Sequence, residues 1–507
     1  MSNPRALMVQ GTCSGAGKSV LVAGLCRLAA RRGIRVAPFK SQNMSLNAAA
    51  TPEGLEIGRA QALQALAAGL RPTVDMNPIL LKPEGERRSQ IVLRGRPVAR
   101  VDFQSYAGYR ERCIKAIDTS LDSLGARHDL LIIEGAGSPA EINLMDRDLA
   151  NMFVARRTDA EVVLVGDIDR GGVFASFVGT LALLDDADRK RVAGFIINRF
   201  RGDIALLEPG LEMLEERTGV PTLGVIPFLD PLGLPEEDGQ QLVIDNKPGR
   251  RGDVVEIAVV CLPRISNHDD FLPLIEDPRA SVRFVDRPEG LAETDLVILP
   301  GSKSTRADLK WLRHRGFDAA LQVHVAGGGH LLGICGGYQM LGRSIEDPRG
   351  VEGEAGTSAG LDLLPVVTTF GPEKTVREVE GRVLSGPEWL VGRVDASEVL
   401  VGYEIHCGTV QPVNAWDTIK REAAPLFSLR PGGGKAAARH DGAVLGQVAG
   451  TLMHGLFDND GIRESVLGSA GASSGPWRAR LLGNLDRLAD VLEEHLDPTF
   501  TERWFSR

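Results

Sequence analysis

Short apolar runs alternate with amphipathic stretches along the first half of the chain, and each run ends in glycine or a polar residue. The runs occupy residues 6–11, 36–40, 130–137, 162–169, 192–200 and 222–228. Apolar runs of strand length separated by helical periodicity are typical of parallel strands joined by crossover helices. The pattern therefore predicts a parallel α/β sheet for this half.

A second series of apolar runs occupies residues 254–261, 282–285, 295–302, 330–335 and 444–455. The stretches 231–241 and 245–253, which are polar and rich in proline or glycine, separate the two series as linkers do. Residues 344–400 have weak periodicity and predict irregular strands and loops, whereas leucines recur with helical spacing over 477–496. We expect an α/β domain at 1–235, a linker at 236–253, a second α/β domain at 254–465 and a helical tail at 466–507.

The composition narrows the classes of partner. The 507 residues include 58 Lys and Arg against 67 Asp and Glu, a formal net charge of −9, which disfavours binding to nucleic acid or anionic membranes. The six cysteines have no metal-ligand spacing, as in a protein of a reducing cytoplasm. The longest apolar run, 171–184, is shorter than the about 20 residues of a membrane span. The segment MSNPRALMVQ lacks the basic region and apolar core of a signal peptide, so none is expected. We expect a soluble cytoplasmic protein, and its oligomeric state stays open.

The first predicted strand leads directly into GTCSGAGKS and then into an amphipathic helix. This order is typical of a phosphate-binding loop, in which backbone N–H groups and the helix N-terminus bind phosphate oxygens, a lysine reaches a terminal phosphate and a serine hydroxyl suits Mg²⁺. The common pattern has its first glycine where Thr12 stands here, so this loop has that glycine one residue early. The predicted ATP site comprises Gly11, Thr12, Gly15, Gly17, Lys18, Ser19 and Lys40.

A Mg²⁺ ion at such a loop normally recruits a carboxylate from the end of another strand. Glu134 ends the apolar run LLIIE and is followed closely by two glycines, so Ser19 and Glu134 are the predicted metal ligands. Lys40 ends the neighbouring predicted strand, where it would meet phosphate or a substrate carboxylate; a solvated strand end is the alternative. ATP and Mg²⁺ are therefore the expected cofactors.

The second half contains HLLGICGGYQML, an apolar strand that leads through a cysteine bracketed by glycines into a helix. Cys335 is expected at a tight elbow, where the helix N-terminus favours the thiolate and the glycines keep the approach open. Acyl transfer also needs a base and oxyanion donors. His454, which leaves the strand-like VAGTLMHG, is the candidate base, and the backbone of Gly301, Ser302 and Gly336 supplies the candidate donors.

A nucleotide loop and an acylating cysteine on one chain are typical of an ATP-dependent amidotransferase that takes ammonia from glutamine. The chain resembles the glutamine-hydrolysing cobyric acid synthases of cobalamin biosynthesis, of the CobB/CobQ type, over nearly its whole length. The motifs that carry the resemblance are PFKSQNMSLN (38–47), GRAQALQA (58–65), MNPILLKP (76–83), IIEGAGSPAEINLMDRDLANM (132–152), DIDRGGVFASFVGTLALL (167–184), FIINRFRGD (195–203), LPGSKST (299–305), GICGGYQMLG (333–342) and GYEIHCG (402–408).

The resemblance implies a domain similar to dethiobiotin synthetase followed by a class I glutaminase domain of flavodoxin-like α/β fold. It implies that ATP activates the b, d, e and g carboxylates of adenosylcobyrinic acid a,c-diamide as acyl phosphates. Ammonia from glutamine then converts them to amides, which gives adenosylcobyric acid. The expected partners are therefore a corrinoid, glutamine and ATP.

Two parts of the sites remain open within this resemblance. Most class I glutaminases orient the catalytic histidine with a glutamate two residues on, which here is Leu456. The resemblance to the cobyric acid branch, which shares that loss, therefore implies a Cys–His dyad, with Glu404 and Asp458 as alternative orienters. No general motif marks the corrinoid site. We expect it in the loop after Glu134, where Asp146 and Asp148 are substrate candidates, together with Asn43 of the KSQNMSLN motif; a solvated charge run is the alternative reading of the loop.

Two other functions compete with this interpretation. Cobyrinic acid a,c-diamide synthase shares both domain types, but KSQNMSLN and GRAQALQA resemble the cobyric acid branch. The first half also resembles the partitioning and septum-positioning ATPases, which would make the protein a regulatory ATPase with an inactive glutaminase. Those ATPases carry a second lysine early in the loop, where Cys13 stands here, and the intact Cys335 and His454 argue against an inactive glutaminase.

Overall fold

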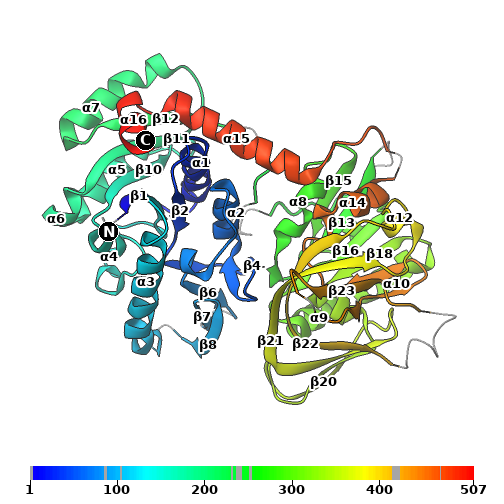
Figure 1. The fold of residues 1–507 in the computed structure, drawn as a ribbon. Coiled ribbons are helices and arrows are strands. Elements are labelled where there is room, and N and C mark those ends of the chain that lie inside the picture. The colour runs from blue at the N-terminus through cyan, green and yellow to red at the C-terminus, as the bar shows by residue number, and fades with distance from the viewer. Residues whose placement is uncertain are drawn as a thin grey trace. The chain divides into compact units, whose positions relative to one another are not determined.

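The computed structural model describes residues 4–84, 88–102, 105–229, 232–235, 242–249, 254–413, 423–434, 436–468 and 470–506. The chain forms two compact units, both drawn in Figure 1. Unit 1 comprises Met1–Ser45, Glu56–Glu237 and Leu481–Arg507, and unit 2 comprises Leu46–Leu55 and Asp238–Arg480. Of the expected linker at 236–253, residues 236–241 and 250–253 lie outside the described residues.

Unit 1 contains a six-stranded parallel sheet in the order β12-β11-β10-β1-β9-β2. The strands are β1 (Arg5–Gly11), β2 (Val36–Phe39), β9 (Leu130–Glu134), β10 (Glu161–Asp167), β11 (Val192–Phe200) and β12 (Thr222–Pro227). The accompanying helices are α1 (Lys18–Arg31), α2 (Arg59–Ala67), α3 (Arg110–Gly125), α4 (Met152–Thr158), α5 (Val173–Leu183), α6 (Asp186–Arg189) and α7 (Glu208–Thr218). The six apolar runs form these six strands, so the predicted parallel sheet is confirmed.

A smaller sheet of unit 1 interrupts this series. It has the order β3-β6-β7-β8 and consists of β3 (Gln42–Met44), β6 (Ile79–Pro83), β7 (Ser89–Leu93) and β8 (Arg96–Val101). The strand β3 follows directly after the end of β2, because Lys40 and Ser41 turn the chain out of the main sheet. After this smaller sheet the chain returns to the main sheet as β9, which lies between β1 and β2 and runs parallel to both.

The C-terminal residues 481–507 belong to unit 1 rather than forming a tail of their own. They include most of α15 (Trp477–His495) and all of α16 (Pro498–Phe505). Leu488 and Leu492 of α15 lie against Gly24 of α1 so closely that a Cβ there would approach Leu492 Cδ1 to 2.5 Å. Arg27 adds two hydrogen bonds to Asp486, at 2.8 and 2.9 Å. Leucines at helical spacing therefore bury an apolar face against the nucleotide-binding sheet's first helix.

Unit 2 contains a six-stranded sheet in the order β15-β13-β16-β18-β26-β25, parallel except for β25. Its strands are β13 (Val255–Val260), β15 (Ala280–Val285), β16 (Leu296–Leu299), β18 (His330–Ile334), β25 (Ala443–Leu445) and β26 (Val448–Thr451). The helices of this unit include α8 (Leu272–Ile275), α9 (Thr305–His314), α10 (Phe317–Ala326), α11 (Gly336–Leu341), α12 (Glu388–Val391) and α14 (Asp460–Leu467). The prediction of a second α/β domain is confirmed.

Residues 344–400, expected to form irregular strands and loops, contribute the strands β19 (Ser344–Asp347), β20 (Gly356–Ala359) and β21 (Val366–Val383) to a second sheet of unit 2. This sheet also contains β22 (Leu400–Pro412), β23 (Phe427–Pro431) and β24 (Arg439–Asp441). The 18-residue β21 pairs antiparallel with β22. Among the described residues, no helix has the length and apolar character needed to cross a bilayer.

Candidate active sites

The phosphate loop joins β1 to α1 in unit 1. Gly15 and Gly17 have φ values of 64° and 95°, a backbone region that side chains other than glycine rarely adopt. A Cβ at Gly17 would also approach Asn198 Nδ2 to 2.1 Å. Lys18 is buried, and its ammonium donates to the carbonyls of Cys13 at 2.9 Å and Gly137 at 3.2 Å. The loop is thus closed around the lysine that was predicted to reach a terminal phosphate.

Strand register brings Glu134 and Lys40 together at the carboxyl edge of the sheet. Ile133 of β9 lies opposite Phe39 of β2, so the residues that follow are neighbours. The buried Glu134 accepts from Lys40 Nζ at 2.8 Å and from Ser19 Oγ at 2.7 Å through Oε1. The structure therefore places the two predicted metal ligands and the predicted strand-end lysine at one point.

A glutamine completes this cluster. Gln64 of α2 donates through Nε2 to Glu134 Oε2 at 2.6 Å. It is fully buried and comes from the GRAQALQA motif, where the sequence signal is a pair of glutamines, Gln61 and Gln64, spaced three residues apart among alanines and leucines. The carboxylate of Glu134 thus accepts hydrogen bonds from Ser19, Lys40 and Gln64, and its charge is paired with the Lys40 ammonium.

An arginine outside the predicted set also lies over the loop. Arg170 follows β10, and its Nη2 lies 3.1 Å from the position of a Cβ on Gly15. The buried carboxylate of Asp167 pairs with Arg170 at 3.3 Å and with Arg199 at 2.8 Å. Asp167, at the end of β10, thereby holds the guanidinium group of Arg170 beside the phosphate loop.

The three substrate candidates of unit 1 differ in their surroundings. Asn43 is buried and donates to Gln61 Oε1 at 3.0 Å. Asp148 caps the following turn, because its carboxylate accepts from the backbone N–H of Ala150, Asn151 and Phe153 at 2.8 to 2.9 Å. Asp146, in the short 3₁₀ turn Met145–Arg147, is exposed. Of the three, Asp146 has the side chain that faces solvent.

Cys335 joins β18 to α11 in unit 2 at φ 50° and ψ −108°, a strained conformation for a residue with a side chain. The neighbouring glycines allow close packing rather than an open approach, which corrects the expectation drawn from the sequence. A Cβ at Gly337 would lie 1.9 Å from the carbonyl of Leu299, and one at Gly336 would lie 2.8 Å from the backbone nitrogen of Ser302. The elbow can form because those positions lack side chains.

The candidate oxyanion donors surround this elbow. Gly301 and Ser302 form the short strand β17, which pairs with β14 (Ile265–Ser266). Gly336 begins α11 against Ser302, and a Cβ on Gly301 would come within 3.1 Å of His454 Cε1. The structure therefore brings Gly301, Ser302 and Gly336 to the same place as the two predicted catalytic side chains.

His454 lies beyond the end of β26 and is fully enclosed. Its Nδ1 lies 2.6 Å from Asp270 Oδ2, and Asp270 Oδ1 accepts from the backbone N–H of Gly455 at 3.0 Å. Burial by itself would lower the pKa of His454, but the charge of Asp270, together with the charge and hydrogen bonding of Cys335, raises it to about 10. The histidine is thus held between the carboxylate of Asp270 and the thiol of Cys335.

Asp270 occupies the place that the sequence assigned to Glu404 or Asp458. Glu404 of β22 is buried in a different ionic cluster, where it accepts from Arg377 Nε at 2.6 Å and from Arg439. Although burial opposes it, hydrogen bonds from His406 and Arg439 hold the pKa of Glu404 far below its usual range. Asp458 follows His454 closely in the chain, but the Nδ1 atom is taken by Asp270. Neither proposed residue is therefore the orienter.

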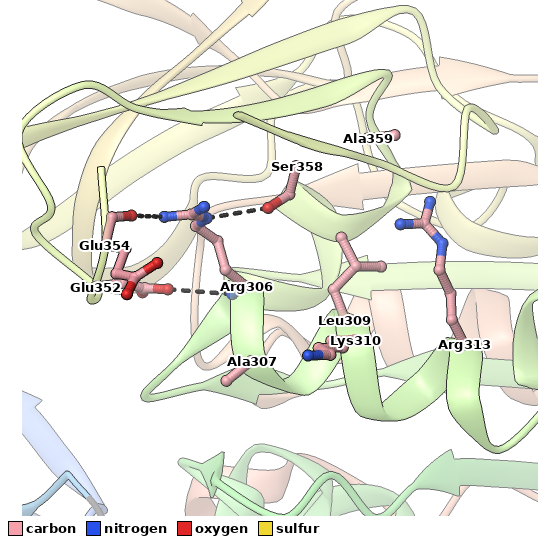
Figure 2. Close-up of a pocket in the computed structure, with 9 residues that line it drawn as sticks. All are labelled: Arg306, Ala307, Leu309, Lys310, Arg313, Glu352, Glu354, Ser358 and Ala359. Atoms are coloured by element: carbon pink, nitrogen blue, oxygen red, sulfur yellow. Dashed lines mark hydrogen bonds between the residues drawn. The ribbon is translucent and has the colours of Figure 1, made fainter. Parts of the chain in front are cut away.

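A pocket of about 490 Å³ lies along α9 in unit 2, and the predicted catalytic residues are not among those that line it. Arg306 donates to the carbonyl of Glu354 at 2.5 Å and to Ser358 Oγ at 3.0 Å, and both hydrogen bonds are drawn in Figure 2. Burial raises the pKa of Glu352 to about 7. The Thr305 hydroxyl, at the start of α9, lies 3.3 Å from Glu352 Oε1 and 3.2 Å from Gln339 Oε1 of α11, within hydrogen-bond distance of both. The pocket wall is thus connected to the helix that follows Cys335.

The comparisons with known proteins agree with this division. The sequence profile of the CobQ/CobB/MinD/ParA nucleotide binding domain matches residues 7–242, and that of the CobB/CobQ-like glutamine amidotransferase domain matches residues 256–462. The chain is 51% identical over 520 residues to a protein of Sorangium cellulosum (strain So ce56) named cobyric acid synthase, and 98% of each chain is covered.

The solved structures that resemble the chain include PurLQS from Thermotoga maritima, with a TM-score of 0.32, 15% identity and coverage of 42% of this chain and 98% of that one. A glutamine amidotransferase, also from Thermotoga maritima, gives a TM-score of 0.28, 17% identity and coverage of 50% and 99%.

Proposed function

This chain belongs to the cobyric acid synthase family, and from that premise we propose that it amidates the b, d, e and g carboxylates of adenosylcobyrinic acid a,c-diamide to give adenosylcobyric acid. The nitrogen comes from glutamine, and ATP activates each carboxylate as an acyl phosphate. The observation that carries the proposal is the pairing, on one chain, of the Lys40–Ser19–Glu134 cluster beside the phosphate loop with the Cys335–His454–Asp270 arrangement.

The ATP half of the reaction belongs to unit 1. Backbone N–H groups of residues 11–19 and the ammonium of Lys18 bind the phosphates, and Arg170 adds a second positive charge beside Gly15. The attacking corrinoid carboxylate displaces ADP from the γ-phosphorus, so the bond between that phosphorus and the bridging oxygen breaks as the acyl phosphate forms. These groups stabilise charge and position the reactants.

The residues at the end of β9 fit a Mg²⁺ ion. A serine hydroxyl and a carboxylate are the oxygen ligands that Mg²⁺ takes in phosphate sites, and here Ser19 Oγ and Glu134 Oε1 lie 2.7 Å apart. Ser19 and Glu134 would hold the ion, whose charge, when bound, neutralises phosphate oxygens. Among the described residues, no group of three or more His, Cys, Asp or Glu side chains forms a metal cage, which agrees with an ion held mainly by phosphate and water.

The glutaminase half belongs to unit 2. The thiolate of Cys335 attacks the side-chain amide of glutamine, and backbone N–H groups at Gly301, Ser302 and Gly336 stabilise the oxyanion. His454 gives its proton to the departing ammonia, and Asp270 keeps the ring in position by accepting from Nδ1. Water then hydrolyses the thioester to glutamate, while ammonia displaces phosphate from the acyl phosphate.

Several observations support this function over its alternatives. The 51% identity over 98% of the chain favours cobyric acid synthase over cobyrinic acid a,c-diamide synthase. The strained Cys335 and the Asp270–His454 pair are the features of a working glutaminase, which a regulatory ATPase would not need. All six cysteines are free thiols, which supports the cytoplasm as the site of action.

Mass spectrometry of the corrinoid product tests the proposal. The purified protein is incubated with ATP, Mg²⁺ and glutamine, and with either adenosylcobyrinic acid a,c-diamide or cobyrinic acid. We expect stepwise conversion of four carboxylates of the diamide to amides, with glutamate and ADP formed in step. Amidation confined to the a and c carboxylates of cobyrinic acid would assign the protein to the diamide synthases, and ATP hydrolysis without any corrinoid product would contradict an amidating function.

A further inference from the structure

The segment Leu46–Leu55 belongs to unit 2, although the chain on either side of it belongs to unit 1. Asn47 Oδ1 accepts from the backbone N–H of Asn267 at 2.8 Å, and its Nδ2 lies 3.0 Å from His268 Nδ1. Ala48 donates to Asn267 Oδ1 at 3.1 Å and accepts from Asn267 Nδ2 at 3.1 Å. Asn47 is itself buried. Four polar contacts therefore fix this segment to the residues just before Asp270.

Asn267, which Asn47 bonds, also contacts the residues around His454. It is held in the left-handed region at φ 54° and ψ 44°, and it accepts at its carbonyl from the backbone N–H of Asp270 at 3.0 Å. Its Nδ2 also donates to the hydroxyl of Tyr403 at 3.0 Å. That hydroxyl lies 3.5 Å from Asp270 Oδ1, and the Tyr403 ring stacks on the ring of His454 at 5.3 Å with an interplanar angle of 16°. Asn47 thus supports the group that positions His454.

The same stretch of chain begins at the nucleotide site. Lys40, seven residues before Asn47, pairs with Glu134 at 2.8 Å. The residues between are also fixed within unit 1: Ser41 Oγ donates to the carbonyl of Leu149 at 2.6 Å, Asn43 donates to Gln61, and the backbone of Ser45 donates to Leu81 at 3.1 Å. The short run 40–47 therefore begins at Lys40, beside the phosphate loop, and ends at Asn47, which bonds Asn267 of unit 2.

We propose that Asn47 is a positioning residue for the glutaminase and that the run 40–47 makes glutamine hydrolysis responsive to nucleotide and corrinoid in unit 1. This inference rests on the proposed function for the identity of the two sites. Glu134 now bonds both Lys40 and Ser19, and a metal and phosphates bound there would draw on the same groups. A change at Lys40 displaces Asn47, and through Asn267 and Tyr403 it alters the placement of Asp270 against His454.

The test compares Asn47→Ala with Glu53→Ala, an exposed position of the same segment. Glutamate release is measured with glutamine alone and again with ATP, Mg²⁺ and the corrinoid diamide. We expect Asn47→Ala to lower the kcat of basal glutamine hydrolysis about tenfold with little change in KM, and to reduce the stimulation by ATP and corrinoid. Ammonia-dependent amidation, which does not use the thiol, stays unchanged, and Glu53→Ala behaves as wild type in all three assays.

Tyr403→Phe provides a second variant, because it removes the hydroxyl and keeps the ring stacked on His454. If Asn47 acts through Tyr403, the effects of the two substitutions on kcat are less than additive in the double variant. Additive effects, or an Asn47→Ala enzyme whose kcat and stimulation match those of Glu53→Ala, would overturn the inference. If Asn47→Ala does not fold, Tyr403→Phe decides alone. Reduced stimulation of its glutamine hydrolysis by ATP and corrinoid supports the inference, and unchanged stimulation overturns it.

Failure of this inference is distinguishable from failure of the proposed function. Basal glutamine hydrolysis needs no corrinoid, so it reports on Asn47 even if another acceptor is the true substrate. Ammonia-dependent amidation of the diamide by the wild-type protein reports on the function whatever Asn47 does. A wild-type enzyme whose glutamine hydrolysis does not respond to ATP with corrinoid would overturn the coupling while leaving the corrinoid reaction supported.

Discussion

The carboxylate of Asp270 and the imidazole of His454 lie 2.6 Å apart, although 184 residues separate them in the chain. The second oxygen of Asp270 accepts from the backbone N–H of Gly455, so both carboxylate oxygens bond the segment His454–Gly455. Asp270 itself lies in the short turn His268–Phe271, at the carboxyl edge of the parallel sheet. The glutaminase therefore has a Cys–His–Asp arrangement in which the acid comes from upstream of the cysteine.

Replacing Asp270 by asparagine is expected to lower glutamine-dependent activity about a hundredfold or more, because the ring then lacks the acceptor that fixes its tautomer and orientation. Amidation driven by added ammonia should stay near the wild-type rate, since it bypasses the thioester. Initial rates with the two nitrogen donors measure both effects. A loss shared equally by both donors would mean that Asp270 acts on the fold rather than on His454.

The same substitution is expected to shift the pH dependence of glutamine hydrolysis. Burial lowers the pKa of His454, whereas Asp270 and Cys335 raise it to about 10, so removing the charge at 270 lowers this pKa. His454 must hold a proton to release ammonia, and activity is lost as pH rises through its pKa. The basic limb of the kcat profile should therefore move to lower pH in Asp270→Asn and stay in place in Asp458→Asn. A shift in the second variant alone would restore Asp458 as the orienter.

Cys335→Ala is expected to abolish glutamine-dependent amidation and to spare the ammonia-dependent reaction, because the thiolate only releases ammonia. Cys261→Ala is the matched control in the same domain. Burial, together with the charge of Asp286, raises the pKa of Cys261 to about 11, so its thiol stays neutral and unreactive. Labelling with a glutamine analogue that alkylates thiolates should mark wild type and Cys261→Ala but not Cys335→Ala. Loss of both nitrogen-donor activities in Cys335→Ala would contradict two separate sites.

Lys18→Ala is expected to remove amidation with either nitrogen donor, since the transferred phosphoryl group loses the cation that stabilises its charge. Lys190→Ala, an exposed lysine of the same unit, should behave as wild type. Basal glutamine hydrolysis by Lys18→Ala should persist, because the thiol site does not use ATP. Normal ammonia-dependent turnover in Lys18→Ala would refute the assignment of the loop.

Local sequence was enough to predict where the candidate site residues that directly follow strands lie in the fold. The phosphate loop, Glu134 and Cys335 each continue an apolar run, so the chain itself carries them to the carboxyl edge of a sheet. The alternation of strand and helix likewise predicted both parallel sheets. In these cases one short stretch determines both the element and its chemistry.

Asp270 was missed because its role depends on a contact between distant segments. It lies in SNHDDFLP, where two adjacent acids follow no motif spacing and where no apolar strand leads directly into it. Residues 344–400 were expected to form irregular strands and loops, and the long regular strand β21 was not predicted for a related reason. Arg377 of β21 lies opposite Glu404 of β22, so an ion pair occupies a position where an apolar pair would have indicated a regular strand. Both features exist only once segments far apart in the chain have paired.

The corrinoid site remains a prediction, and Asp146 offers its sharpest test. The side chain of Asp146 is exposed, and so are two large apolar residues of the same loop, Ile142 at 62% and Leu144 at 39%. An exposed acid beside exposed apolar groups suits a ligand with an apolar macrocycle and amide or carboxyl side chains. We expect Asp146→Asn to slow amidation and to let partly amidated corrinoids accumulate, which chromatography and mass spectrometry of the products would reveal.

Asp148→Ala is the contrasting variant, because Asp148 caps the turn through three backbone N–H groups. Its loss should cost about 0.5 to 2 kcal/mol of the free energy of unfolding, whereas Asp146→Asn should leave the unfolding curve unchanged. ATP affinity and basal glutamine hydrolysis should stay near wild type in Asp146→Asn, since neither uses this loop. Unchanged amidation rates and product distribution in that variant would show that Asp146 is an ordinary solvated acid.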